Sequence, residues 1–317
     1  MRKILIIKTS SLGDIVHALP AISDIARHCP EIVVDWMVEE FFTAIPALHP
    51  AVQRIIPAAT RRWRKSPFSR ETWYEVASLR RMLRDRSYDL TIDLQGLMKS
   101  AMLSWLVPAH RVGYAWSSAR EPLATLAYQE KFAVPWTLHA VERNRLLAAQ
   151  ALGYVPEPEA RYGLNPPTSA PGWAPTKPYV VLLHATSRPH KEWPERHWIE
   201  LGRRLHDQGL SAVIPGGSNP ERARAVRLAS SIPSALAAPV MNLAELAALL
   251  AHARCVVGVD TGLSHLAVAL NRPVVAIFTA TRPEDTGVYG SPLAVNCGGK
   301  KQNPSVETVL QALTLSC

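Results

Sequence analysis

MRKILIIKTSSLGD, residues 1–14, opens the chain with a short apolar strand, a polar Ser-Gly loop and one carboxylate, Asp14. The helix-compatible stretch Ile15 to His28 follows directly. Asp14 is therefore predicted to be the N-cap of that helix, where a carboxylate accepts free backbone N–H groups. Ligands of open α/β sheets bind at the carboxyl ends of such strands. Two interpretations of Asp14 follow, a structural cap or a catalytic base that also caps the helix.

Apolar strands and helix-compatible stretches alternate along both halves of the chain. The first half has three such strands, at Ile4–Ile7, Ile32–Val38 and Leu90–Leu94. The second half continues with predicted elements at Tyr179–Leu183, Glu195–Asp207, Ser211–Ile214, Pro220–Ser230, Leu243–Ala251, Cys255–Val259, Val274–Phe278 and Val306–Leu313. Continuous apolar strands that alternate with helices indicate a mostly parallel sheet covered on both faces. The predicted fold class is therefore α/β.

A proline-rich stretch separates the two halves. Seven prolines lie between Val155 and Pro178, which is typical of an extended linker. We therefore expect two similar domains, residues 1–165 and 166–317, with a cleft between them that would hold a ligand. The chain stops soon after its final helix, so any return of that helix towards the first domain would be short.

The composition excludes several classes of protein. Of the 317 residues, 48% are hydrophobic and 19% charged, as in globular proteins of two domains. No apolar run approaches the ~20 residues that span a bilayer, and no signal-peptide core precedes the first strand, so we expect a cytoplasmic location. The cysteines fit no metal-ligand spacing, and we expect them to be free thiols: Cys29, Cys255, Cys297 and Cys317.

Positive charge is concentrated in one segment of the first half. The net charge is +9 and the pI about 9.6. Residues 61–86 hold nine Lys or Arg against three acids, and so carry +6 of that excess. Trp63 and Trp73 lie among these cations, a mixture that suits nucleic-acid stacking or a membrane interface, whereas the simpler interpretation is a solvated face. An anionic partner is expected, namely nucleic acid, an acidic membrane or a charged substrate.

HATSRPHKEWP, residues 184–194, follows the strand that opens the second half. Thr186, Ser187 and Lys191 supply two hydroxyls and an ammonium, which can hydrogen-bond and neutralise a phosphate or diphosphate. The segment lacks the Gly-Lys-Ser/Thr of a P-loop, so an ordinary NTPase site is excluded. A solvated loop before a helix remains the alternative.

VVGVDTGLSHLAVAL, residues 256–270, predicts a buried strand, a turn and a helix. Thr261 and Gly262 lie where the helix begins, so free N–H groups would bind an anion close to the backbone. Asp260 suits the hydroxyls of a sugar or ribose better than a phosphate, the alternative being a helix cap. His265 is one turn further on and is either a ligand contact or a polar packing residue.

PGGSNPERARAV, residues 215–226, ends a strand in Gly216-Gly217 and places Glu221 in the first turn of the next helix. Carboxylates beyond such a turn often hold ribose hydroxyls in nucleotide-binding folds. The full Gly-x-Gly-x-x-Gly pattern is missing, so support for a NAD site is weak.

Seven motifs occur in a fixed order: KTSSLGDIVHALPA (8–21), RRWRK (61–65), DLQGLMKSA (93–101), AREPLA (119–124), HAVERN (139–144), HATSRPHKEWP (184–194) and VDTGLSHLA (259–267). The series resembles the heptosyltransferases of lipopolysaccharide inner-core assembly, glycosyltransferase family 9, and its N-terminal and basic segments resemble the heptosyltransferase I members. The resemblance implies a GT-B architecture of two facing, doubly wound Rossmann-like domains, the first for the acceptor and the second for the ADP-sugar. It further implies inverting transfer of L-glycero-D-manno-heptose from ADP-heptose to the Kdo region of Kdo2-lipid A, and peripheral contact with the inner membrane.

The resemblance also implies a role for individual residues. Asp14 would be the general base, and Lys191 would stabilise the departing diphosphate. The donor would be held by Thr186, Ser187, Lys191, Glu221, Met241, Asp260, Thr261, Gly262 and His265. Within that set Glu221 would bind the ribose, Met241 would lie by the adenine and Asp260 would take the heptose hydroxyls. The acceptor's carboxylates and phosphates would meet Arg61, Arg62, Arg64, Lys65 and Arg120.

Neither a cofactor nor a metal is expected, because the sequence has no paired Asp-x-Asp of the kind that a Mg²⁺-bridged nucleotide-sugar site uses. Two positions depart from the family pattern. Ser187 stands where relatives commonly carry Thr, and Thr279-Ala280-Thr281 replaces a Gly-Pro-Thr near the diphosphate.

Three alternative functions remain open. One is a related heptosyltransferase that acts on a later core acceptor, against which the Arg-rich segment 61–65 argues, since that acceptor lacks the Kdo carboxylate. Another is a non-enzymatic anion or nucleic-acid binder, although no recognised nucleic-acid module appears. The third is an inactive relative that retains only lipid A binding, against which the presence of Asp14 and Lys191 speaks.

Overall fold

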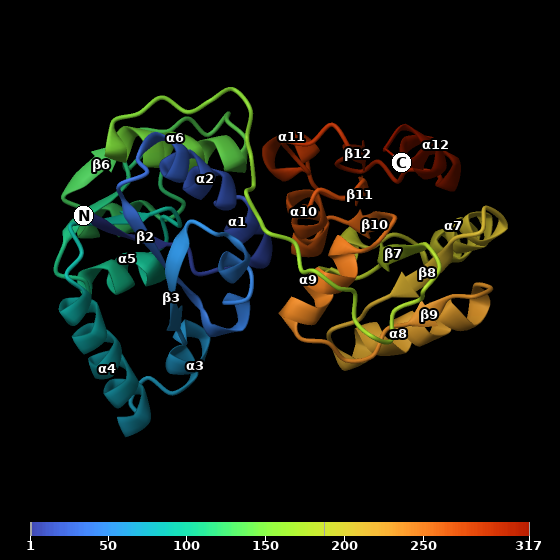
Figure 1. Cartoon of the computed structure of the whole chain (residues 1–317), viewed down its shortest axis with the longest axis horizontal. Coiled ribbons are helices and arrows are strands. Elements are labelled where there is room, and N and C mark those ends of the chain that lie inside the picture. Colours follow the sequence, from blue (N-terminus) through green and yellow to red (C-terminus); the bar gives the residue numbers. More distant parts are fainter. Residues whose placement is uncertain (1, 187, 317) are drawn as a thin grey trace. The chain divides into compact units, whose positions relative to one another are not determined.

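The computed structural model describes residues 2–186 and 188–316 of the chain. It divides the chain into two compact units, Met1–Gly163 and Leu164–Cys317. Figure 1 colours the first unit from blue to green and the second from yellow-green to red. No helix in the described part of the chain is long and apolar enough to cross a membrane.

The first unit is built on a six-stranded parallel sheet in the order β3-β2-β1-β4-β5-β6. This is the strand order of dinucleotide-binding folds, in which the order reverses beside the first strand. The elements are β1 (Lys3–Ile7), α1 (Leu12–Val16), α2 (Leu19–His28), β2 (Val33–Glu39), η1 (Glu40–Phe42), η2 (Pro46–Leu48), β3 (Val52–Ala58), α3 (Thr60–Lys65), α4 (Arg70–Arg86), β4 (Leu90–Asp93), α5 (Met98–Trp105), β5 (His110–Tyr114), η3 (Pro122–Ala127), β6 (Glu130–Phe132) and α6 (Ala140–Leu152).

The core of the first unit forms on both faces of its central strand, β1, where Ile4 to Ile7 are fully buried. Leu5 and Ile7 pack in one cluster with Leu83 of α4 and Leu103 of α5. Successive side chains of a strand point to opposite faces, so Ile4 and Ile6 face the other side. The helices α2 and α6 pack together on that side (Figure 1). The apolar run of β1 is therefore explained by burial on both faces.

The second unit repeats this topology with the sheet order β12-β11-β10-β7-β8-β9, again all parallel. Its elements are β7 (Tyr179–Leu183), η4 (Pro189–Lys191), α7 (Glu195–Asp207), β8 (Ser211–Ile214), α8 (Asn219–Ser231), β9 (Leu236–Ala237), α9 (Leu243–Ala251), β10 (Cys255–Val259), α10 (Gly262–Ala269), β11 (Val274–Phe278), α11 (Pro283–Thr286), β12 (Ala294–Gly298) and α12 (Val306–Ser316). The cluster around Val180 and Leu182 of β7 includes residues of α7, α8 and α12. The final helix, α12, packs on β11, β12 and α7 of its own unit.

The predicted α/β class is confirmed, with a Rossmann-like sheet in each unit. The predicted single helix from Ile15 to His28 is wrong, because α1 ends at Val16 and α2 begins at Leu19. Pro20 has no N–H to donate to the carbonyl four residues earlier, so a continuous helix would lose a hydrogen bond there. The predicted N-cap is also wrong. Ser11 caps α1, and Asp14 is the third helical residue, whose carboxylate accepts the Ser11 N–H at 2.9 Å.

Candidate functional site

A cavity of about 240 Å³ lies at the carboxyl ends of the strands in the second unit. Residues of several strand-to-helix connections line it: Leu183, Ala185, Thr186, Pro215, Gly216, Gly217, Glu221, Met241, Leu246, Thr261 and Leu263. The structure thus brings together four of the predicted donor-site residues, which come from segments far apart in the sequence. The end of a parallel sheet where several such connections meet is the usual ligand site of an open α/β fold.

The wall of this cavity beside β8 is a tight turn into α8. A Cβ at Gly216 would lie 2.7 Å from the backbone nitrogen of Arg222, so only glycine fits there. The Glu221 carboxylate accepts the N–H groups of Gly217 at 2.8 Å and Ser218 at 2.9 Å through Oε2. Glu221 therefore closes a capping box and also lines the cavity. Within the described part of the chain its Oε1 has no hydrogen-bond partner and is available to a ligand hydroxyl.

The N-terminus of α10 contributes backbone donors at the opposite wall. Thr261 is the N-cap, and its side chain makes no capping hydrogen bond, while Gly262 is the first helical residue. The predicted alternative role of Asp260 as the helix cap is therefore wrong. The first N–H groups of a helix have no partner within the helix, so this end of α10 is suited to an anionic group.

A compact polar group adjoins the cavity. The Lys191 ammonium and the Asp260 carboxylate form an ion pair of 2.5 Å between Nζ and Oδ2, with 15% and 12% of their side chains exposed. Thr281 donates its hydroxyl to the same Oδ2 at 2.5 Å, and the Thr186 hydroxyl donates to the Asp260 carbonyl at 3.1 Å. Thr186 thus connects the cavity wall to the ion pair. The departures from the family pattern, Thr279 and Ala280, therefore leave unchanged the threonine that contacts this carboxylate.

The loop that carries Thr186 and Lys191 is held at both ends by Arg224 of α8. The guanidinium donates to the carbonyls of His184 at 3.3 Å and Trp193 at 2.8 Å. It is buried and pairs with Glu192 at 2.6 Å. Arg224 was not predicted from the sequence, because within the run PERARAV nothing distinguishes it from an ordinary exposed arginine of a helix.

In the first unit, Asp14 lies among hydrogen-bond donors and cations. Its Oδ2 accepts the N–H of Ser11 at 2.9 Å and the hydroxyl of Ser11 at 3.2 Å. Arg120 Nη1 lies 3.3 Å from both carboxylate oxygens. Burial raises the pKa of Asp14, but Lys8, Arg120 and Ser11 outweigh it and hold this pKa below its usual value. Asp14 is therefore ionised at neutral pH, as a general base must be.

Lys8 is a functional candidate that sequence reasoning left without a role. It is buried, and its Nζ donates to the Leu94 carbonyl at 2.5 Å and to Asn144 Oδ1 at 3.0 Å. Burial lowers the pKa of Lys8 to about 8, although the Asp14 charge opposes that shift. The sequence did contain a signal for Lys8, because a lysine directly after an apolar strand lies at the sheet edge where ligands bind. Its contact with Asn144 could not be predicted, because the two residues are far apart along the chain.

The DLQG motif organises the loop that leads to Asp14. Gln95 Oε1 accepts the N–H groups of Thr9 at 2.8 Å and Ser10 at 3.1 Å. Asp93 in turn accepts the Gln95 N–H at 2.8 Å and the Tyr128 hydroxyl at 2.6 Å. Burial raises the pKa of Asp93 despite these hydrogen bonds. The motif therefore holds the loop in place from within the fold.

The predicted acceptor cations on α3 differ in their availability. Arg62 is paired with Glu75 at 2.8 Å and Glu40 at 3.3 Å. Arg61 lies over the Phe42 ring, 5.2 Å from its centre. The side chains of the other two cations have no partner among the described residues and are exposed: Arg64 and Lys65. Folding thus leaves the end of α3 as the part of this segment that is open to an anionic ligand.

Among the described donor candidates, Lys191, Asp260, Gly262 and His265 are not part of the cavity lining. His265 is buried in α10 and has an interaction partner in the fold. Ser187 lies outside the described residues. Among residues 2–186 and 188–316, no group of three or more His, Cys, Asp and Glu side chains is arranged to hold a metal ion.

Known proteins are similar to this chain over most of its length. The family model described as glycosyltransferase family 9 (heptosyltransferase) matches residues 76–313. Lipopolysaccharide heptosyltransferase 1 of Pseudomonas aeruginosa is 48% identical over 290 residues, which are 91% of this chain and 81% of that protein. The structure of E. coli heptosyltransferase WaaC with ADP superposes with a TM-score of 0.91 and 41% identity, over 99% of this chain and 100% of that one. WaaC with ADP-2-deoxy-2-fluoro heptose gives a TM-score of 0.88 at the same identity and coverage. The predicted architecture of two Rossmann-like domains is confirmed.

Proposed function

The chain belongs to glycosyltransferase family 9, the heptosyltransferases, and on that premise we propose that it transfers L-glycero-D-manno-heptose from ADP-heptose to the Kdo region of Kdo2-lipid A. This would be the first heptose of the lipopolysaccharide inner core. The observation that carries the proposal is the cavity of the second unit, which combines the Glu221 carboxylate, a helix N-terminus and an adjacent lysine. The structures of WaaC with ADP and with an ADP-heptose analogue support ADP-heptose as the donor.

The donor nucleotide fits the chemistry of the cavity wall. The free Oε1 of Glu221 would accept a ribose hydroxyl, and the apolar side chains of Met241 and Leu246 would lie against the adenine. Thr186, Thr261 and the first N–H groups of α10 would hydrogen-bond the diphosphate. The Asp260 carboxylate would take heptose hydroxyls, since carboxylates accept such hydrogen bonds.

Lys191 would stabilise the charge that develops on the departing diphosphate. An ammonium has three N–H donors, and the contact with Asp260 uses one of them. The other two remain for phosphate oxygens. Fixed positive charge and helix dipoles directed at a leaving group lower the barrier because they need no reorganisation during the reaction. We propose that these groups act without a metal ion.

Asp14 would be the general base on the acceptor. Its ionised carboxylate would take the proton of the attacking Kdo hydroxyl while that oxygen bonds to the anomeric carbon and the ADP–sugar bond breaks. A single displacement of this kind inverts the anomeric configuration. Base catalysis of this type contributes ~10²–10⁴-fold to the rate.

The acceptor is anionic, and the exposed cations of the first unit suit it. Arg64 and Lys65, which have no partner in the described part of the chain, would meet carboxylate and phosphate groups, and Arg120 extends towards the base. Arg61 and Arg62 also belong to the proposed set, although their guanidinium groups already have partners within the unit. Because the acceptor is a lipid, we propose a cytoplasmic enzyme in peripheral contact with the inner membrane.

ADP release tests the proposal. The purified protein would be incubated with ADP-heptose and Kdo2-lipid A in the presence of EDTA, alongside the variant Asp14→Asn, which keeps the size of the side chain. We expect acceptor-dependent ADP release from the wild type, and a loss of at least about 100-fold in kcat for the variant with ADP affinity retained. An active Asp14→Asn variant would refute the base assignment. Donor binding without release would indicate a later core acceptor, and loss of activity with EDTA would refute the metal-free mechanism.

A further inference from the structure

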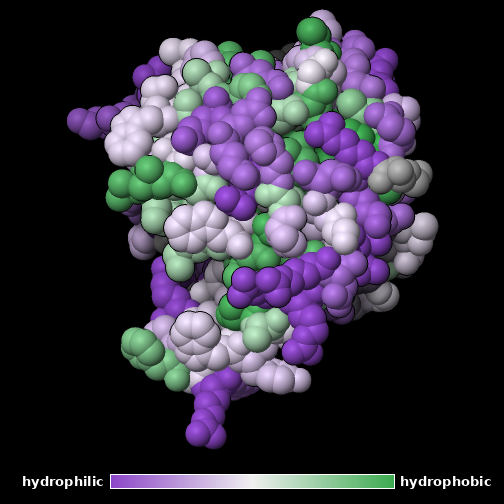
Figure 2. All heavy atoms as spheres, turned by 90° about the vertical axis from the view of Figure 1, so that its left-hand side faces the viewer, coloured by the Kyte–Doolittle hydropathy of each residue, from purple (hydrophilic) through white to green (hydrophobic). Residues whose placement is uncertain are grey.

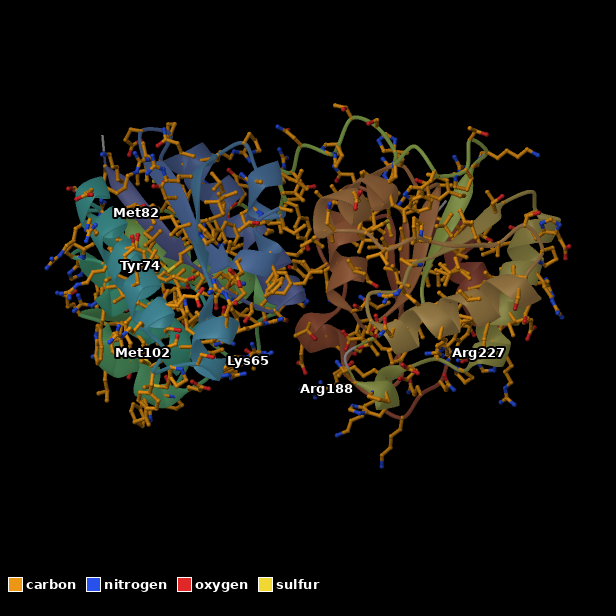
Figure 3. All side chains as sticks on the ribbon, turned by 90° about the horizontal axis from the view of Figure 1, so that it is seen from below. Lys65, Tyr74, Met82, Met102, Arg188 and Arg227 are labelled. Carbon is orange, nitrogen blue, oxygen red and sulfur yellow. The ribbon has the colours of Figure 1, made fainter. Side chains whose placement is uncertain are left out.

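Lys8 is a buried cation to which the proposed reaction gives no role. Figure 2 shows hydrophilic side chains over much of one face of the first unit, and Figure 3 labels Lys65, an exposed cation of that unit. Lys8, by contrast, is 6% exposed and directly follows β1. A buried charge costs free energy unless other groups compensate it, so this ammonium needs partners within the fold.

Hydrogen bonds connect Lys8 to the helix that carries Asp14. The Lys8 Nζ donates to the Leu94 carbonyl at 2.5 Å and to Asn144 Oδ1 at 3.0 Å, and neither acceptor is charged. The amide nitrogen of the same Asn144 donates to the His17 carbonyl at 3.1 Å. His17 is the C-cap of α1, and Asp14 is the third residue of that helix. Lys8 and Asn144 therefore hold the end of α1 beside the carboxyl end of β1.

Charged side chains also act on the Lys8 ammonium. Asp14 and Asp93 favour the protonated form, Arg120 and Arg143 oppose it, and Asp14 has the largest effect of these four. Burial lowers the pKa of Lys8 to about 8, a value that leaves the side chain mostly protonated at pH 7. The interaction is mutual, because Lys8 has the largest effect among the groups that lower the pKa of Asp14, ahead of Arg120.

The two cations beside Asp14 differ in their access to other anions. The Arg120 side chain is 52% exposed, and its Nη1 lies 3.3 Å from the Asp14 carboxylate. In the proposed function Arg120 also meets the carboxylates and phosphates of the acceptor, which would then share its positive charge. Lys8 is buried, so no acceptor group competes for its charge. Lys8 is therefore the cation whose effect on Asp14 persists when the acceptor is bound.

We propose that Lys8 is a positioning residue for Asp14: its buried ammonium keeps the carboxylate ionised while the acceptor engages Arg120, and its contact with Asn144 fixes the helix that carries Asp14. Desolvation favours the protonated form of a carboxyl group, which cannot accept a proton from the attacking hydroxyl. Salt screens a buried charge much less than an exposed one, so the effect of Lys8 should persist at high ionic strength. The inference rests on the proposed function, in which Asp14 is the base.

The first test follows the titration of Asp14 without any substrate. Aspartate carboxyl carbons are labelled with ¹³C, and the Asp14 signal is identified by its absence from Asp14→Asn. Lys8→Gln removes the charge but keeps an amide donor, and we expect the midpoint of the Asp14 titration to rise by at least about one pH unit, since an adjacent opposite charge lowers such a midpoint by about 1–3 units. Lys3→Gln is the matched control at the other end of β1, where Nζ donates only to the Arg86 carbonyl, and should leave the midpoint unchanged.

The second test is the pH dependence of ADP release. The acid limb of kcat should move to higher pH in Lys8→Gln, and further than the acid limb of kcat/KM, because the acceptor shares the charge of Arg120 only in the complex. Asn144→Leu keeps the ammonium but removes the hydrogen bond to the His17 carbonyl. This variant should lower kcat several-fold without moving the acid limb, which separates the charge of Lys8 from its hydrogen bonds.

An unchanged Asp14 midpoint in folded Lys8→Gln would overturn the inference, and so would a kcat that falls equally at every pH, as a purely structural role predicts. Lys8→Met is a second variant without the charge and should show the same rise, so a folding defect in one variant does not decide the test. A wild type that releases no ADP, together with the expected rise in Lys8→Gln, would refute the proposed function and leave the effect of Lys8 on Asp14 standing. An active wild type with the same midpoint in both proteins would refute the inference alone.

Discussion

Replacement of Lys8 by Met should change how the stability of the protein depends on pH. Burial lowers the pKa of Lys8 to about 8, against 10.5 for the unperturbed side chain. In the unfolded chain the lysine keeps its proton up to the higher value. Between pH 8 and 10.5 the unfolded state therefore binds more protons than the folded state, and the free energy of unfolding rises with pH. A difference of about 2.5 pKa units at about 1.4 kcal/mol each predicts a rise of about 3 kcal/mol from this group.

The substitution also removes two hydrogen bonds. The Leu94 carbonyl and Asn144 Oδ1 would each lose the donor that lies at 2.5 and 3.0 Å in the wild type. Buried acceptors without donors cost about 1–3 kcal/mol. Below pH 8 the variant gains stability because it no longer buries a charged lysine. The loss of the two hydrogen bonds offsets this gain, so Lys8→Met should be about as stable as the wild type near pH 7. The free energy of unfolding of the wild type has risen by pH 10.5, whereas that of the variant has no such rise from this position. The variant should therefore be less stable than the wild type by about 3 kcal/mol at pH 10.5.

Urea unfolding of both proteins at several pH values between 7 and 10.5, followed by tryptophan fluorescence, measures this difference. Other titrating groups cancel because both proteins contain them. Lys65→Met serves as the control, because Lys65 is exposed and its loss should leave the difference from the wild type flat. A difference between Lys8→Met and the wild type that stays constant over this pH range would refute the argument that burial keeps the folded lysine neutral at high pH.

Three further predictions concern local packing and charge. Gly258→Ala should destabilise the second unit by about 2–3 kcal/mol in thermal unfolding, because the added Cβ would clash with the Ser264 hydroxyl. Gly172→Ala is the control: its Cβ would meet nothing within 4 Å, so the stability should not change. Arg64→Ser should raise the acceptor KM several-fold with little change in the donor KM. Arg62→Ser should mainly destabilise the fold, because that guanidinium is already paired. Equal effects of the two substitutions on the acceptor KM would contradict these different roles. Thr281→Val removes one hydroxyl from the carboxylate beside the cavity and should raise the donor KM by about fivefold, with an unchanged donor KM counting against a role for that carboxylate.

The central strands were predictable because burial on both faces demands an uninterrupted apolar run. The predicted bounds Tyr179–Leu183, Cys255–Val259 and Val274–Phe278 are those of β7, β10 and β11, which are buried throughout. The strands that sequence reasoning missed show no such run. In β3, exposed residues interrupt the apolar ones, and β9 at the other sheet's edge has two residues. A strand near an edge is stabilised mainly by its neighbour, which the local sequence does not reveal.

Candidate site residues were predictable where the chemistry is local. A strand followed by Ser, Thr, Gly or Asp and then a helix marks a sheet end with free donors, and such segments supplied Asp14, Thr186, Glu221 and Thr261. Arg224 and Asn144 were not predictable, because each acts on backbone or side-chain groups far away in the chain. Their roles exist only once the sheet has brought those groups within hydrogen-bond distance.

The α/β class, the central strands and the loops that carry polar groups follow from local sequence, because periodicity, turn chemistry and helix termini act over a few residues. Which charges in those segments remain available to a ligand depends on the folded structure. Arg62 and Arg64 are two residues apart and chemically identical, yet Arg62 is paired across the fold with Glu75 and Glu40, whereas Arg64 has no partner among the residues that the structure describes. The physical reason is that an ion pair depends on distance in space, and folding alone sets that distance for residues far apart in the chain.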